Sequence, residues 1–139
     1  MADQRFDFPV PLYDSTLTVV ILDGVYVDDM EQFHASLAAL GIPNDDEGED
    51  PELFPFRALT WDAHFEAEPR PYASKGRWVV AFTRNVNPEL LAHEALHVTL
   101  MLSQWHGLRV SEKPKNHEHL CYVQGWVTGR LHEALDRVR

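Results

Sequence analysis

Cysteine and long hydrophobic runs are nearly missing from this sequence. Its 139 residues include one cysteine, Cys121, which excludes an internal disulfide and a zinc site made of several thiolates. The longest uncharged aliphatic stretch, around LTVVIL, is far shorter than the roughly 20 apolar residues that cross a membrane. The first residues, MADQRFDFPVPLYD, are charged and lack the apolar centre of a secretory signal. We therefore expect a cytoplasmic protein with no membrane partner.

Positive charge is also scarce. Lysine and arginine number 12 against 22 aspartate and glutamate residues, which gives a formal net charge of −10, and no basic stripe is visible. Such a surface repels nucleic acid and anionic membranes, so neither is expected as a partner. The length, with an apolar fraction of 45%, suits a single domain with one core over residues 1–139.

Three parts of the chain have the composition of β-structure. Asp23-Gly24 separates two β-prone runs and predicts a hairpin, because both positions of a tight turn favour positive φ. RALTWDAHF and GRWVVAFTRN predict further strands within residues 57–84.

A helix is expected directly after the predicted hairpin. Asp28 and Glu31 form a capping-box pattern ahead of a helix over about residues 29–40, which Gly41 can end. Residues 1–42 are thus predicted as a hairpin and a helix. The acidic segment that follows, 43–52, predicts a solvated loop, with a calcium or partner site as the alternative.

Two long helices are predicted in the second half of the chain, over residues 88–137. Asn87 is a good N-cap, followed by proline at the first helical position, and the helix should run from about Pro88 to Trp105. Gly107 can stop it. A second helix is expected from about residue 116 to 137.

The motif HEALH places His93, Glu94 and His97 within the first of these helices. Residues four apart lie one turn apart on one helix face, so the two imidazoles stand where a single Zn²⁺ can bridge them. Glu94 is rotated slightly around the helix and can act as base on a water at the metal. A chance HExxH is expected roughly 0.04 times in a chain of this composition. We therefore favour a metal site over three polar residues on an ordinary helix.

A catalytic zinc needs a third protein ligand and keeps its fourth position for water. The segment KNHEHLCYVQGW offers His117, Glu118 and His119, about twenty residues after His97, which is enough chain to turn and return antiparallel. Consecutive helical residues point about 100° apart, so only one of the three can face the metal well. The spacing alone leaves all three open.

A family resemblance appears at these residues. LLAHEALHVTLMLSQWHGL followed by NHEHLCYVQGW resembles the small HExxH metallopeptidase-like proteins encoded by tailed bacteriophages. In that group a HEAxH helix is followed by a short turn and a helix starting E-x-x-x-Y-x-x-G, here Glu118, Tyr122 and Gly125. The resemblance covers about residue 77 to the end. It implies an α+β, zincin-like (minigluzincin) domain, in which a small antiparallel or mixed sheet packs on the HExxH helix and the following C-terminal helix.

The resemblance also implies roles for individual residues. The metal ligands would be His93, His97 and Glu118, and Glu94 would be the catalytic base. The hydroxyl of Tyr122, one turn after Glu118, would stabilise a tetrahedral oxyanion, and a core tyrosine is the alternative.

The expected function follows from these roles. It is that of a zinc-dependent metallopeptidase, which hydrolyses a peptide or protein substrate through a zinc-activated water. The alternative is a zinc-binding structural or interaction module without catalysis, phage-associated in one version. A phage-encoded chain would lie in the host cytoplasm or on the virion. The sequence does not indicate the oligomeric state.

The strand GRWVVAF is expected to lie nearest the site. An edge strand in a zincin-like fold can pair with an extended peptide, here through the backbone of residues 80–83. The alternative, favoured for the apolar face of Val79 and Ala81, is a buried central strand.

Overall fold

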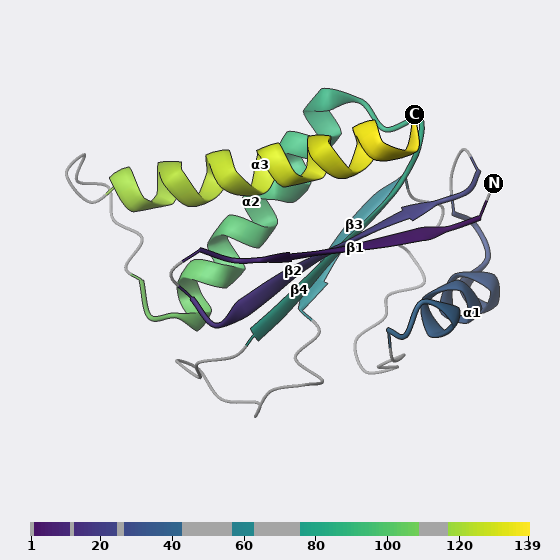
Figure 1. Cartoon of the computed structure of the whole chain (residues 1–139), viewed down its shortest axis with the longest axis horizontal. Helices are drawn as coiled ribbons and strands as arrows, with labels where there is room; N and C mark the ends of the chain where they lie inside the picture. Colours follow the sequence, from purple (N-terminus) through teal and green to yellow (C-terminus); the bar gives the residue numbers. More distant parts are fainter. Residues whose placement is uncertain (1, 12, 25–26, 43–56, 63–75, 109–116) are drawn as a thin grey trace.

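The computed structural model describes residues 2–11, 13–24, 27–42, 57–62, 76–108 and 117–139. Within these ranges the chain forms a four-stranded mixed sheet and three helices, with α1 on one face of the sheet and α2 and α3 on the other (Figure 1). The predicted α+β class, with a mixed sheet against two C-terminal helices, is confirmed. The acidic segment 43–52 lies outside the described residues.

The order of strands across the sheet is β1-β2-β4-β3. β1 (Gln4–Pro9) is antiparallel to β2 (Ser15–Leu22), β2 is parallel to β4 (Gly76–Thr83), and β4 is antiparallel to β3 (Ala58–Asp62). Every residue of β4 is buried, as is every residue of β2 from Leu17 onward. Strands that are apolar on both faces suit the interior of a sheet, so β1 and β3 form the edges of the described sheet.

The hairpin predicted around Asp23-Gly24 is wrong. The neighbours of β2 are β1 and β4, and among the described residues between the turn and α1 only Val27 forms a bridge. Gly24 does adopt a positive φ of 112°, so the chain turns there, but it turns toward α1. The local turn signal was real, whereas the partners of β2 were decided by the need to cover two apolar faces.

The strand GRWVVAF, expected nearest the site, is β4, and it is a buried central strand flanked by β2 and β3. Its backbone is paired on both sides, so residues 80–83 have no edge to offer to a peptide. In the described sheet, the edge strand next to α2 is β3.

The first helix, α1 (Met30–Ala39), starts one residue later than its capping pattern predicted. Asp29, not Asp28, is the N-cap, and its side chain accepts a hydrogen bond from the backbone nitrogen of Gln32 at 3.1 Å. Gly41 has a φ of 79° and ends the helix as predicted.

The two faces of the sheet have separate cores, because successive side chains along a strand point to opposite faces. The core under α1 contains Val20, Leu22, Phe33, Leu37, Ile42, Val79 and Ala81. The larger core under α2 and α3 contains, among others, Leu17, Val19, Ile21, Trp78, Val80, Phe82, Leu91, Ala95, Val98, Leu102, Val127 and Leu131.

The two long helices follow the prediction closely. α2 (Pro88–Trp105) has the expected bounds, and α3 (Glu118–Val138) begins slightly later than residue 116. The side chain of Asn87 caps α2 by accepting a hydrogen bond from the backbone nitrogen of Leu90 at 2.8 Å. No helix in the described ranges is long and apolar enough to cross a membrane.

Candidate metal centre

The orientation of α2 on the sheet decides where the HEALH side chains point. Leu91, Ala95, Val98 and Leu102 are all buried, and their spacing forms one helical stripe against the sheet. The opposite arc of the helix is therefore turned to solvent. His93 and His97 lie on this exposed arc, as neighbours one turn apart.

The two histidines present a pair of nitrogens at the spacing of metal ligands. The Nε2 atoms of His93 and His97 lie 3.1 Å apart, and the ring centroids lie 4.8 Å apart at an interplanar angle of 77°. Two nitrogens bound to one tetrahedral zinc at 2.0–2.1 Å are about 3.3 Å apart. The pair thus fits zinc with little movement.

Glu94 completes the cluster from a buried position. Its side chain is 5% exposed, and its ligand atom lies with those of His93 and His97 within a group in which all atoms are within 4.8 Å of one another. Thr60 Oγ1 donates a hydrogen bond to Glu94 Oε2. This bond ties the carboxylate of Glu94 to β3 and orients it.

Thr60 is a site residue that the sequence analysis did not identify. It lies on β3 opposite Val80 of β4, and Val80 belongs to the core under α2 and α3. Thr60 therefore faces α2, while its neighbour Trp61 faces α1 and packs edge-on against Phe33. Only the alternation along β3 could have suggested this orientation, and only once the pairing of β3 was known.

None of the three candidates for the third ligand, His117, Glu118 and His119, joins this group. Among the described residues, the close group contains only His93, Glu94 and His97. Thr99 on α2 donates a hydrogen bond to Gln124 on α3 at 2.7 Å, which shows which side of α3 faces α2. Glu118 precedes Gln124 by six residues, so the two side chains point about 120° apart around the helix, and Glu118 is exposed.

Tyr122 is also turned away from the cluster. It lies two residues before Gln124, so the two side chains point about 160° apart around α3, and Tyr122 is 73% exposed. Its exposure excludes the predicted alternative of a core tyrosine. Glu118 and Tyr122 do share one helix face, as their spacing predicts, but that face of α3 is turned to solvent.

A second polar contact holds the other end of α2. His106, the C-cap of the helix, contacts Ser15 at the start of β2 through its Nε2 atom at 2.9 Å, and its ring stacks on Tyr13 at 4.2 Å. Burial lowers the pKa of His106, because the charged imidazolium is less well solvated there. This contact fastens α2 to the sheet.

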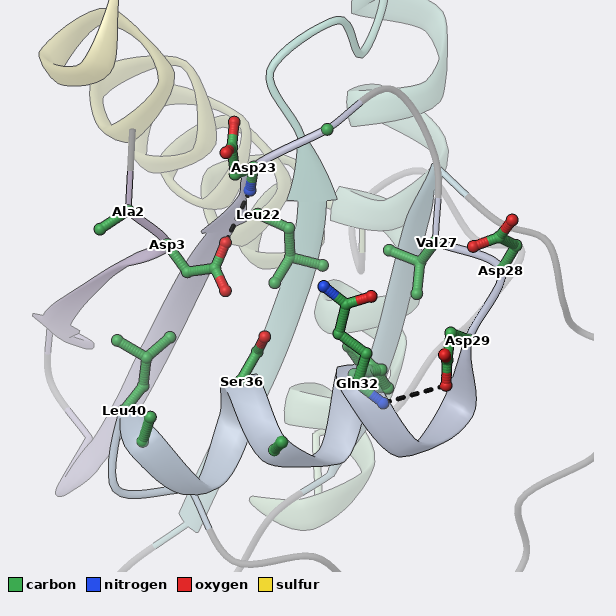
Figure 2. A pocket seen from close by; sticks show the side chains of 14 residues that line it. Ala2, Asp3, Leu22, Asp23, Val27, Asp28, Asp29, Gln32, Ser36 and Leu40 are labelled. Carbon is green, nitrogen blue, oxygen red and sulfur yellow. Dashed lines mark hydrogen bonds between the residues drawn. The ribbon is translucent and has the colours of Figure 1, made fainter.

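A hollow of about 690 Å³ lies on the α1 side of the sheet, away from the histidine pair, and is shown in Figure 2. Apolar side chains such as Leu22 and Phe33 line it together with several aspartates. Two of these acids are already hydrogen-bonded to backbone nitrogens, Asp3 to Asp23 at 2.7 Å and Asp29 to Gln32. The described residues that line this hollow contain no close group of metal ligands.

Comparisons of the chain with models of protein families, with curated proteins and with solved structures found no match. A functional proposal therefore depends on the chemistry of the side chains on α2, β3 and α3.

Proposed function

We propose that this protein is a zinc-dependent metallopeptidase whose HExxH helix is zincin-like. The observation that carries the proposal is the group of His93, Glu94 and His97, with two exposed imidazole nitrogens 3.1 Å apart and a buried, oriented carboxylate beside them. The donor set suits zinc, which prefers imidazole nitrogen and tolerates carboxylate oxygen. The motif resemblance described above supports the same reaction class.

The chain's own residues have defined tasks in this proposal. A zinc ion held by His93 and His97 would polarise a carbonyl group and lower the pKa of a water molecule. Glu94 would accept the proton of the attacking water at Oε1 and then donate it to the leaving amine. Thr60 would keep the carboxylate in place through Oε2 throughout.

The position of β3 supports a peptide as the substrate. This strand is an edge of the described sheet, and Thr60 connects it directly to Glu94. An extended chain that pairs with β3 at this edge of the described sheet would run past the carboxylate, and strand addition of this kind needs no sequence-specific pocket. The pairing with a peptide that was predicted for GRWVVAF is thus proposed for β3.

The test is zinc content together with hydrolysis of an unfolded protein substrate. We expect about one zinc per chain in the parent under dilute conditions and almost none in His97→Ala. His132→Ala, which alters a histidine on α3 outside the group, is the matched control and should keep its zinc. Glu94→Gln should keep zinc but lose hydrolysis by about 10²- to 10⁴-fold, the usual contribution of a general base.

The third ligand implied by the resemblance is tested separately. Because Glu118 stands apart from the group, Glu118→Ala should bind zinc as the parent does. A large loss of zinc in that variant would show instead that the first turn of α3 approaches α2 when metal binds. Full hydrolysis by Glu94→Gln would overturn the peptidase mechanism.

A second candidate is a zinc-binding interaction module without catalysis. It is favoured by the small number of ligands: the described residues bring together two exposed histidines and no residue of α3. Bound zinc with no hydrolysis in either the parent or Glu94→Gln would support it.

A further inference from the structure

The exposed arc of α2 carries more than the histidine pair. Leu96 is 50% exposed and Leu100 is 42% exposed, unusual values for leucines in the middle of a packed helix. Leu96 is three residues after His93, and Leu100 is three after His97, so the four side chains form two adjacent rows on one helix face. We call these four residues the α2 face.

Within the described residues, the α2 face offers a zinc ion two exposed ligands, His93 and His97. Zinc in proteins is almost always four-coordinate in structural sites. His93 and His97 supply two donors, whereas Glu94 is buried and held by Thr60 on the side of β3. No described residue of α3 joins them. As far as the described residues go, two coordination positions therefore remain unfilled, and donors from a second molecule can take them.

We propose that these two positions are filled by His93 and His97 of a second copy of this chain, so that one zinc ion joins two α2 faces in a symmetric dimer. A two-fold axis through the metal would give each copy the same role, as in most homodimers. Four imidazole nitrogens form a complete tetrahedral set. Leu96 and Leu100 of both copies would pack beside the metal and lose their contact with water.

The charge of the chain makes this association depend on metal. Each copy has a formal net charge of −10, so two copies repel each other. Two exposed leucines on each side are too small an apolar area to hold a dimer alone. A divalent cation between the copies supplies both the missing attraction and the fixed geometry.

This inference rests on the metal site of the proposed function and adds a partner to it. In the dimer the second copy fills the coordination positions that hydrolysis requires for water and substrate. The dimer is therefore the resting form, and the monomer with zinc is the form able to hydrolyse peptides. Dilution should raise the specific activity per chain.

The experiment measures mass by sedimentation velocity on the full chain, purified without a metal-binding tag, during titration with zinc. We expect a monomer in chelator and a dimer at about 0.5 zinc ions per chain, with return to monomer when chelator is added in excess. His97→Ala should remain monomeric at every zinc concentration. The double variant Leu96→Asn with Leu100→Asn should still bind zinc but dimerise at least tenfold more weakly.

The matched control is Tyr122→Asn, which removes an even more exposed apolar side chain from α3 and should leave dimerisation unchanged. Circular dichroism would verify that every variant is folded. A parent that binds one zinc per chain and stays monomeric at all protein concentrations would overturn the dimer and leave the metal site intact. A parent that binds no zinc would overturn both. A dimer that survives in chelator would also overturn the inference. So would a leucine double variant that dimerises as tightly as the parent.

Discussion

At the scale of the residue, the contact with the most direct effect on the candidate centre is the hydrogen bond from Thr60 to Glu94. Thr60→Val keeps the shape of the side chain but cannot donate, so the carboxylate would lose its fixed orientation. We expect zinc content to be unchanged and peptide hydrolysis to fall by about 10- to 100-fold, the usual effect of losing such a supporting group. Thr60→Ser, which restores the donor, should recover most of the activity. Equal activity in the valine and serine variants would contradict a positioning role.

His106 gives a second prediction at this scale. Its pKa is lowered by burial, so between the ordinary value of 6.5 and the lower folded value the unfolded chain binds more protons. Its contribution to stability is therefore present above pH 6.5 and is lost as the pH falls below it. Urea unfolding at pH 7.5 and 5.5 should show a smaller loss of stability on acidification in His106→Phe, which keeps a flat ring against Tyr13. An identical loss in the parent and the variant would contradict this account.

At the scale of the element, the N-terminus of α2 controls how well the HEALH turn is held. Asn87 accepts the hydrogen bond that satisfies the backbone nitrogen of Leu90. Asn87→Ala should lower the free energy of unfolding by about 1 kcal/mol, because the first turn of the helix loses its cap. Asn87→Asp keeps an acceptor and is the matched control, which should stay close to the parent. Chemical denaturation measures both, and a loss as large in Asn87→Asp as in Asn87→Ala would exclude the cap as the cause.

At the scale of the whole molecule, a charged network joins three strands of the sheet. Arg77 on β4 is 7% exposed and donates to Thr18 on β2 at 2.7 Å and to Asp7 on β1 at 3.3 Å. Thr18 in turn donates to Asp7 at 2.7 Å. Partial burial opposes the ionisation of Asp7, but hydrogen bonds from Arg5 and Thr18 and the charges of Arg5 and Arg77 outweigh it and lower the pKa of that carboxyl.

The direction of this pKa shift determines how the contribution of Asp7 to stability changes with pH. Asp7 contributes stability above its unfolded value of 3.8 and loses it as the pH falls through the lower folded value. Asp7→Asn should be less stable than the parent at neutral pH by about 1 kcal/mol, a modest figure because the carboxylate is half exposed. The deficit should shrink toward pH 2. Asp136→Asn, an exposed aspartate on α3, is the control, and a deficit for Asp7→Asn that is constant with pH would contradict the assignment.

Much of the helical structure could be predicted from the sequence. The bounds of α2, its Asn87 cap and the stop at Gly41 were all predicted from local patterns. The close approach of His93 and His97 was readable for the same reason. Helical hydrogen bonds join residues four apart, so the chain itself sets which side chains become neighbours.

Strand partners and the packing of α3 were decided by the tertiary structure alone. Nothing local in STLTVVIL indicated that its neighbours would be β1 and β4, and nothing local in RALTWDAHF placed Thr60 against Glu94. The spacing of Glu118 and Tyr122 put them on one face of α3 but did not say which face α2 would cover. A strand pairs with residues far away in the chain, and a helix is rotated by whichever face buries most apolar surface. The sequence by itself therefore determined the helices and the histidine pair, while the sheet order, the support of Glu94 and the exposure of Glu118 depended on contacts between distant segments.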